Sequence, residues 1–306
     1  MIYTCTLNPA IDYRLELDTF SLGALNRASF NKFSGGGKGI NVSILLKELG
    51  VDNTALGFVG GFTGAYLKDY LKETYDLKMA FTPIKDLTRI NVKLQIKSDN
   101  TEVNAKAPVV SKEEFDDLVS KVNELGKDDL FILGGSTIEP KYDAYLVLAE
   151  KCFNNQVPFV IDTEKENLLK TLPFKPFLIK PNRYELEQLT NQSIHNEFDL
   201  IKAAKDLLVK GAQNIIVSLG KEGSYFINDT LILKALPIKG KALNPVGAGD
   251  SMVAGFVSEY IRSKDLIKSY KMSIASGTAT AFSYSIAKKE TVHKYLKNVK
   301  IEEVKV

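Results

Sequence analysis

The stretch that decides the interpretation of this chain is Asn244-Pro245-Val246-Gly247-Ala248-Gly249-Asp250-Ser251. It follows an extended segment and opens an apolar helix, so small residues occupy the predicted helix start. Small residues let backbone N–H groups approach a ligand closely, and a helix N-terminus carries partial positive charge. The stretch therefore predicts a binding site for an anion such as a phosphoryl group.

Asp250 is the only nearby side chain that can take a proton. An anion site beside a carboxylate suits phosphoryl transfer, in which positioning and charge stabilisation supply most of the catalysis. We expect the helix dipole to keep Asp250 ionised, which suits a weak base. The competing interpretation is an ordinary helix start with an aspartate as its capping residue.

A second glycine-rich stretch, Ser34-Gly35-Gly36-Gly37-Lys38-Gly39-Ile40-Asn41-Val42, precedes an amphipathic helix predicted from Asn41 to Leu49. Lys32 and Gly39 exclude a P-loop, and Ile40 excludes the dinucleotide-binding pattern. The stretch therefore predicts a glycine-rich turn that brings the backbone and Lys38 close to a polyhydroxy or phosphorylated ligand. A flexible loop is the alternative.

Two further polar stretches follow short apolar segments that read as strands. The first is Lys180-Pro181-Asn182-Arg183-Tyr184-Glu185, in which Asn182 and Glu185 share one face of a new helix. These two side chains could orient water on Mg²⁺, or they could form a plain helix cap. The second, Ser218-Leu219-Gly220-Lys221-Glu222-Gly223, could hold nucleotide phosphates or ribose, or could turn into a hairpin.

Short apolar strands alternate with helices from residue 130 onward, which predicts an α/β fold with a parallel sheet covered on both faces. Extended segments near residues 12–33 and 89–107 do not fit this rhythm and predict a small β-sheet lid. The strand 89–96 is expected to pair with residues 102–105 across residues 98–100. No repeat or linker divides the chain, so we expect one domain over residues 1–306. The other predicted strands are 2–7, 55–59, 130–133, 158–161, 177–179 and 215–219, and the predicted helices include 142–152 and two between 249 and 282.

The composition excludes several classes of protein. The formal net charge of +3 over 306 residues is too small to argue for nucleic acid or a membrane surface. Cys5 and Cys152 form no disulfide framework and fit a reducing compartment, and no signal-peptide pattern opens the chain, so we expect a cytoplasmic protein. Two histidines argue against a Cys/His metal site. Motifs of common hydrolases and redox enzymes are absent.

Three of these stretches together resemble the signatures of the ribokinase-like (PfkB) carbohydrate kinase family. Residues 244–250, continued by Ala254-Gly255, look like its C-terminal signature. Gly36-Gly37-Lys38-Gly39 with Asn41 resembles its N-terminal signature, and Asn182-x-x-Glu185 its third motif. The three occur in the family's order, so the resemblance covers essentially the whole chain.

The resemblance implies a Rossmann-like three-layer α/β sandwich whose β-sheet lid pairs with that of a partner in a homodimer. It also implies ATP and Mg²⁺. Asp250 would take the proton from the sugar hydroxyl, and Gly247, Ala248 and Gly249 would form the anion hole. Candidate nucleotide and Mg²⁺ residues by this resemblance are Lys180, Asn182, Glu185 (which would hold Mg²⁺ through water), Ser218, Gly220 and Gly223. Candidate sugar residues are Asp12, Gly36, Gly37, Lys38 and Asn41, with Arg89, Arg27 and Ser136 for the phosphate already on the substrate.

Four segments indicate the substrate within the family: residues 1–12, 54–64, 88–93 and 101–104. They are similar to the members that phosphorylate fructose 1-phosphate. We therefore expect ATP-dependent phosphorylation of its 6-hydroxyl to give fructose 1,6-bisphosphate. One alternative is phosphorylation of tagatose 6-phosphate at its 1-hydroxyl. Another is a non-catalytic sugar-phosphate sensor, against which the presence of Asp250 argues.

Overall fold

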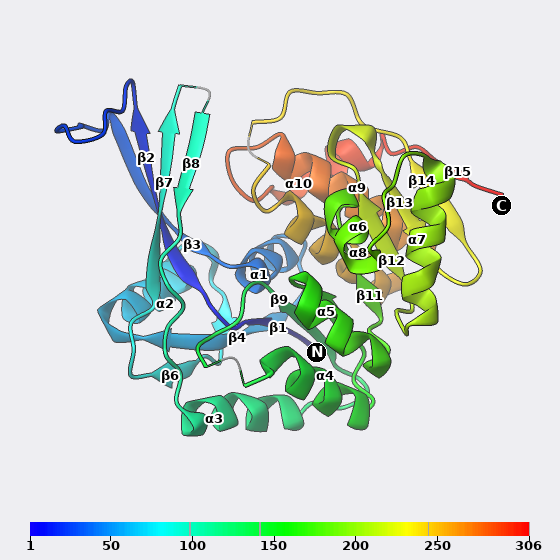
Figure 1. Cartoon of the computed structure of the whole chain (residues 1–306), viewed down its shortest axis with the longest axis horizontal. Helices are drawn as coiled ribbons and strands as arrows, with labels where there is room; N and C mark the ends of the chain where they lie inside the picture. The colour runs from blue at the N-terminus through cyan, green and yellow to red at the C-terminus, as the bar shows by residue number, and fades with distance from the viewer. Residues whose placement is uncertain (98, 141, 244, 306) are drawn as a thin grey trace.

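The computed structural model describes residues 1–97, 99–140, 142–243 and 245–305, and its centre is a large β-sheet (Figure 1). Six strands run parallel in the order β12-β11-β10-β9-β1-β4. Because β4 and β9 lie on opposite sides of β1, the chain reverses its direction across the sheet there. The six strands are β1 (Ile2–Thr6), β4 (Asn53–Gly60), β9 (Leu130–Gly134), β10 (Phe159–Asp162), β11 (Leu178–Ile179) and β12 (Ile215–Ser218).

Short strands extend both edges of this parallel core. At one edge, β5 (Lys78–Met79) and β6 (Thr82–Ile84) pair with β4 in parallel. At the other edge, β13 (Ser224–Ile227), β14 (Ile232–Ala235) and β15 (Ile301–Glu303) continue from β12 in antiparallel register. The expected α/β class with a parallel sheet is confirmed.

Helices cover the two faces of the sheet, and alternate residues of its central strands, such as β9 and β12, enter two separate hydrophobic cores. In β9, for example, Leu130 and Ile132 belong to one core, and Phe131 and Leu133 to the other. The helices of the first core are α1 (Lys38–Glu48), α8 (Ala248–Ser263), α9 (Leu266–Ala281) and α10 (Lys289–Leu296). The helices of the second are α3 (Lys112–Asn123), α4 (Ala144–Asn154), α5 (Lys165–Thr171), α6 (Arg183–Thr190) and α7 (Glu197–Val209).

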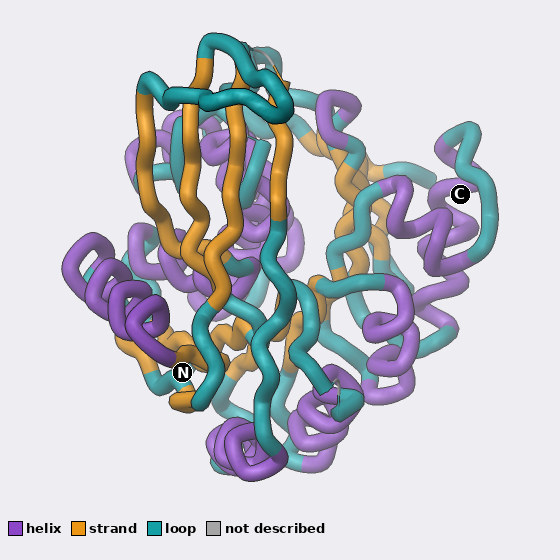
Figure 2. Tube along the Cα trace, turned by 60° about the vertical axis from the view of Figure 1, so that its left-hand side comes forward, coloured by secondary structure: helices purple, strands orange, loops and turns teal. Residues whose placement is uncertain are grey.

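A separate four-stranded sheet, which we call the lid, stands beside this body (Figures 1 and 2). Its strand order is β3-β2-β7-β8, and β2 follows β1 through the Asn8-Pro9 turn. The lid is formed mainly by the two segments near residues 12–33 and 89–107 that did not fit the alternation of strands and helices. Its strands are β2 (Ala10–Leu17), β3 (Phe30–Gly36), β7 (Arg89–Ile96) and β8 (Asp99–Val103).

Several predicted boundaries are wrong. The hairpin partner of β7 spans 99–103 instead of 102–105, because Ile96 pairs directly with Asp99 and the connection is tighter than expected. Ser98, one residue of the predicted turn, lies outside the described residues. Gly35 and Gly36 lie in β3 instead of a turn, α1 begins at Lys38 instead of residue 41, and α4 begins at residue 144 instead of 142.

The two faces of the lid differ in polarity, as alternation along a strand requires. One face carries Asp12, Asn91 and Lys93, which line a cavity against the body. The opposite face is apolar and includes Phe33 and Val103, which are 40% and 56% exposed. The lid is therefore a two-sided sheet with its polar face toward the body.

A row of aromatic rings joins the lid to helix α2 (Gly61–Tyr75). Tyr13 stacks on Phe33 with ring centroids 4.3 Å apart, and Phe33 meets the edge of Tyr66 at 5.8 Å. Tyr66 then stacks on Tyr70, which contacts Tyr75. Because such pairs are stabilising beyond their buried area, this aromatic row holds the lid strands against α2.

No helix among the described residues is long and apolar enough to cross a membrane.

Candidate active site

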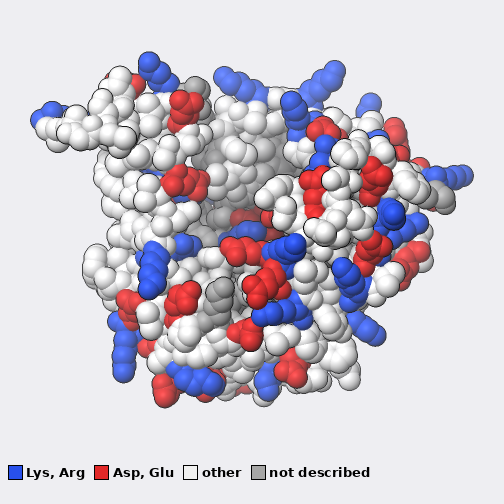
Figure 3. Space-filling model, viewed as in Figure 1, with Lys and Arg blue, Asp and Glu red and all other residues white. Residues whose placement is uncertain are grey.

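A cavity of about 510 Å³ lies between the polar face of the lid and the carboxyl ends of the parallel strands. The corresponding face of the molecule is hollowed between the lid and the body in the space-filling view (Figure 3). In open α/β sheets, ligands bind outside the carboxyl ends of the strands, where the strand order reverses. The cavity is lined by Ala10, Asp12, Gly37, Lys38, Asn41, Arg89, Asn91, Lys93, Glu102, Asp162, Lys180, Asn182, Glu185, Ser218, Val246, Gly247, Gly249 and Asp250.

The N-terminus of α8 points its backbone into this cavity. Gly247 caps the helix with φ +78, and a Cβ there would lie 2.7 Å from Cδ1 of Ile286. The Ala248 N–H donates to the Pro245 carbonyl at 3.2 Å, whereas the N–H groups of Gly249 and Asp250 have no acceptor within the described residues of the helix. The first turn therefore presents N–H donors to an anion, chiefly from Gly249 and Asp250. Asn244, the first residue of the motif, lies outside the described residues.

The carboxylate of Asp250 is buried, with 7% of the residue exposed. The Asn41 amide donates to its Oδ2 at 2.8 Å. Burial, together with the negative charge of Asp162, raises the pKa of Asp250 to about 6. The helix dipole is expected to keep Asp250 ionised, but burial and a neighbouring carboxylate outweigh the dipole, so the pKa lies above its ordinary value. Above neutral pH the group is still ionised and can accept a proton.

Asp162, at the end of β10, joins two lysines at the floor of the cavity. Its Oδ1 lies 2.8 Å from Nζ of Lys38, and its Oδ2 lies 3.4 Å from Nζ of Lys180. Although burial opposes ionisation, the two lysines hold the pKa of Asp162 below its ordinary value. For Lys38, burial is likewise outweighed by Asp162, so the pKa of that ammonium is raised. The three groups form a charged cluster beside Asp250.

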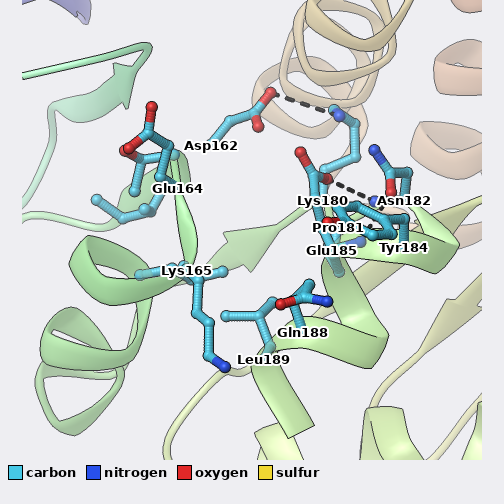
Figure 4. A pocket seen from close by; sticks show the side chains of 13 residues that line it. Asp162, Glu164, Lys165, Lys180, Pro181, Asn182, Tyr184, Glu185, Gln188 and Leu189 are labelled. Carbon is cyan, nitrogen blue, oxygen red and sulfur yellow. Dashed lines mark hydrogen bonds and ion pairs between the residues drawn. The ribbon is translucent and has the colours of Figure 1, made fainter. Parts of the chain in front are cut away.

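Asn182 and Glu185 form a capping box at the start of α6. The Glu185 N–H donates to Oδ1 of Asn182 at 2.8 Å, and the Asn182 N–H donates to Oε2 of Glu185 at 2.7 Å. The structure thus confirms the helix-cap interpretation. Both residues also line the main cavity and an adjoining cavity of about 350 Å³ between α5 and α6 (Figure 4).

The residues present fit a bound Mg²⁺ that keeps most of its water. The described residues contain no group of three or more acidic, cysteine or histidine side chains that could hold a metal ion. Mg²⁺ is commonly held by one or two carboxylates together with substrate phosphates, so a dedicated cage is not needed. Glu185 and Asp162 supply carboxylates at the shared boundary of the two cavities.

The lid contributes the carboxylate of Asp12. Its Oδ1 accepts from the Asn91 amide at 3.0 Å, and its Oδ2 lies 3.0 Å from Nζ of Lys93. A Cβ at Gly36 would lie 2.7 Å from Oδ2 of Asp12, so a side chain on that residue would displace the carboxylate. The glycine therefore makes room for Asp12 at the base of the lid.

Arg89 begins strand β7 at the base of the lid, beside the turn after β1. Its Nη1 donates to the Ala105 carbonyl and its Nη2 to the Asn8 carbonyl, both at 3.3 Å. Its Nε is buried without a hydrogen-bond acceptor. The Asn8 amide also donates to Oγ of Ser136 at 3.2 Å, which connects the loop after β9 to the same turn. One N–H donor of Arg89 therefore has no partner among the described residues. Ser136 contacts Asn8 but does not line the cavity.

Six predicted residues do not line the cavity: Arg27, Gly36, Ser136, Gly220, Gly223 and Ala248. Arg27 is exposed in the loop between β2 and β3, because that loop extends from the far end of the lid. Gly220 and Gly223 form the tight connection from β12 to β13, which is the hairpin alternative. A Cβ at Gly223 would lie 2.2 Å from the Ala235 carbonyl, so packing explains this glycine. Of the Ser218–Gly223 stretch, only Ser218 lines the cavity.

Three charged lining residues were not predicted: Asp162, Lys93 and Glu102. Asp162 directly follows the apolar stretch 159–161, so the rule that placed Lys180 at a strand end applies equally to it. Lys93 and Glu102 look like ordinary charges on half-exposed strands. Only the antiparallel pairing of β7 with β8 brings them together over the cavity.

Comparisons with known proteins agree with this geometry. The model of the pfkB family of carbohydrate kinases matches residues 5–291. The 1-phosphofructokinase of Bacillus subtilis (strain 168) is 41% identical over 98% of this chain and 99% of its own. A tagatose-6-phosphate kinase of Staphylococcus epidermidis is 36% identical over 85% of this chain and 86% of its own. Phosphofructokinase-2 from Escherichia coli, solved in complex with substrates and products, is similar with a TM-score of 0.92 and 25% identity, covering 97% of this chain and 98% of that one.

Proposed function

The chain belongs to the pfkB family of carbohydrate kinases, and we propose that it transfers a phosphoryl group from ATP to the 6-hydroxyl of fructose 1-phosphate. The observation that carries this proposal is the buried carboxylate of Asp250 at the open N-terminus of α8, inside a cavity that also contains Arg89. The relatives with high identity over nearly their whole length include a 1-phosphofructokinase. The product would be fructose 1,6-bisphosphate.

In the proposed reaction, Asp250 accepts the proton of the sugar hydroxyl as its oxygen bonds to the γ-phosphorus of ATP. The bond from that phosphorus to the bridging oxygen breaks at the same centre, and ADP leaves with the electron pair. The N–H groups at the start of α8, chiefly those of Gly249 and Asp250, stabilise the charge on the transferred group. Gly247 caps the helix, and the N–H of Ala248 is already bonded to the Pro245 carbonyl. Lys38 and Lys180 add positive charge beside the same centre.

Mg²⁺ would neutralise charge on the β- and γ-phosphates of ATP. We propose that Glu185, through water, and Asn182 position this ion, and that Lys180 and Ser218 lie along the nucleotide. Gly220 and Gly223 could contribute only by moving toward it, since they lie outside both cavities.

The sugar would lie against the lid. Asp12, Gly37, Lys38 and Asn41 line the cavity that contains Asp250 and are proposed to hold the hydroxyls of the sugar, and Gly36 makes room for Asp12. At the base of the lid, the guanidinium of Arg89 lines the cavity and is proposed to bind the 1-phosphate. Arg27 and Ser136 would act on that phosphate only after rearrangement or from a second copy of the chain.

The function is tested by measuring ADP release with Mg-ATP in the presence of fructose 1-phosphate, tagatose 6-phosphate or fructose 6-phosphate. We expect kcat/KM for fructose 1-phosphate to exceed the others by at least about 10-fold, as differential binding of one phosphate position allows. A preference for tagatose 6-phosphate would keep the mechanism and overturn the substrate. Binding of a sugar phosphate without any ADP release would favour the sensor alternative.

Replacing Arg89 with Ala should raise KM for the sugar phosphate by about 10–100-fold, because a hydrogen bond to a charged group is lost. The KM for ATP should change by less than about 2-fold, since Arg89 lies on the lid and not along the proposed nucleotide. Steady-state kinetics with each substrate varied in turn measures both values. Equal loss for the two substrates would remove Arg89 from the sugar site.

We also propose that two copies of the chain associate through the apolar face of the lid. This face exposes Phe33 and Val103, and the nearby loop exposes Leu22 and Leu25 by 91% and 76%. Light scattering should give a mass about twice the 33.9 kDa of one chain. Phe33→Asp should then reduce the mass to that of a monomer, whereas Phe198→Asp, at another exposed phenylalanine on α7, should leave the dimer intact. A monomeric wild-type protein would refute this arrangement.

A further inference from the structure

The carboxylate of Asp12 is held on both oxygens by donors from the neighbouring strand of the lid. Asn91 donates to Oδ1 and Lys93 lies beside Oδ2, each at 3.0 Å. The side chains of Asp12 and Lys93 are only 15% and 23% exposed. Solvent therefore screens this ion pair less than an ion pair on an open surface.

The position of this pair follows from the register of the lid. Asp12 pairs with Asn91 across β2 and β7, and Lys93 follows two residues later on the same face. Lys93 in turn pairs with Glu102 on β8, with its Nζ 3.8 Å from the glutamate carboxylate. A row of alternating charge, Asp12, Lys93 and Glu102, thus crosses three strands over the cavity.

The charges in the cavity determine whether it can accept an anionic sugar phosphate. A phosphate monoester carries a charge of about −1.5 to −2 at neutral pH. The cavity already contains the carboxylates of Asp12, Glu102, Asp162, Glu185 and Asp250. Asp162 is compensated by two lysines, whereas among the described residues the cation paired with Asp12 is Lys93, and Arg89 acts on Asp12 from farther away. Without Lys93, Asp12 would repel an anionic sugar.

We propose that Lys93 is a positioning residue that neutralises Asp12 and thereby allows the lid to accept a phosphorylated ketose. The inference rests on the proposed function, in which Asp12 receives sugar hydroxyls. Lys93 holds one oxygen of the carboxylate, Asn91 holds the other, and the remaining lone pairs face the sugar. The pair of Asp12 and Lys93 accepts hydroxyl hydrogen bonds without adding a net negative charge next to the substrate.

Lys93→Met tests the inference because it removes the charge and keeps the length of the side chain. We expect the KM for fructose 1-phosphate to rise by about 10–100-fold, as loss of a charged hydrogen bond and like-charge repulsion predict. The KM for ATP should change by less than about 2-fold. Lys93→Arg should restore much of the affinity. Lys97→Met is the matched control, since Lys97 is an exposed lysine on the same lid outside the cavity.

A double variant separates charge neutralisation from simple packing. If Lys93 acts by neutralising Asp12, then adding Asp12→Asn to Lys93→Met removes the repelling charge and should recover at least about 3-fold of the lost affinity. If Lys93 only supports the lid, the second substitution should lower the affinity further. That result, or a Lys93→Met variant equal to Lys97→Met, would overturn the inference. Failure of the wild-type protein to phosphorylate any ketose phosphate would instead overturn the proposed function.

Discussion

Asp250→Asn should reduce kcat by about 10²–10⁴-fold, the usual contribution of a general base. The variant should still bind ATP and the sugar phosphate with affinities within a few-fold of the wild type, because the amide keeps the shape and the hydrogen bond from Asn41. Steady-state kinetics gives the loss of turnover, and calorimetric titration of each substrate gives the affinities. In the wild type, kcat should fall as the pH drops below about 6, where Asp250 becomes protonated.

The same substitution should make the folded protein more stable at pH 8. The pKa of Asp250 in the folded state, about 6, lies above the ordinary value of 3.8. Ionisation therefore costs the folded state free energy that the unfolded state does not lose, and this destabilisation grows between pH 4 and 6. We expect the Tm of Asp250→Asn to exceed that of the wild type by roughly 2–6 °C at pH 8 and to match it below pH 4. Thermal denaturation at several pH values measures the difference.

Asp265→Asn supplies the matched control, because Asp265 caps α9 by accepting from the backbone of Ile267 and Lys268. Asparagine caps a helix about as well as aspartate. This variant should keep normal turnover and nearly normal stability. If Asp250→Asn behaves in the same way, the proposed role of Asp250 as base is wrong.

Asp162→Asn should lower stability by about 3–5 kcal/mol at pH 7, since it removes the counter-charge of two lysines in the cavity floor. Lys180 is buried, with 7% exposed, and lies 3.4 Å from Asp162. The Tm difference should shrink toward acidic pH, because the pKa of Asp162 is lowered in the folded state and its stabilisation is lost as the pH falls. Turnover should also decrease, because Lys38 and Lys180 lose their positions.

The pH profile provides a second readout on Asp162. Its negative charge contributes to the raised pKa of Asp250, so removing it should shift the acidic limb of kcat to lower pH. An unshifted limb would show that the two carboxylates are not coupled. Asp143→Asn is the control, because Asp143 pairs with Lys170 on the surface and is 59% exposed. That variant should change neither the limb nor the Tm by a measurable amount.

The sequence patterns predict the body of the fold because each parallel strand is apolar on both faces. The stretches 130–133 and 158–161 need no tertiary information to be recognised as buried strands, and they lie within one residue of β9 and β10. The lid is harder, because its strands are short and its hairpin register depends on contacts between strands. The error at β8 has this origin: alternation finds the strand 89–96 but does not fix where its partner begins.

Some features of the candidate site are likewise predictable from the sequence, and others are not. Motif residues at helix starts and strand ends, such as Asp250 and Lys180, are predictable because the topology places those ends together. The pKa of Asp250 is not predictable, since it depends on burial and on Asp162, a residue more than eighty positions away. The role of Lys93 is not predictable for a similar reason, because its partner Asp12 lies on a different strand, far away in the sequence.

The aromatic row between the lid and α2 has a consequence for spectroscopy. The chain contains no tryptophan, so its intrinsic fluorescence comes from tyrosine and phenylalanine. Phe33 stacks on Tyr13 and touches Tyr66 across the junction of lid and helix. A tryptophan introduced at Phe33 would be the sole indole in the protein, and energy transfer from the neighbouring tyrosines would report the distance between lid and body without any external label.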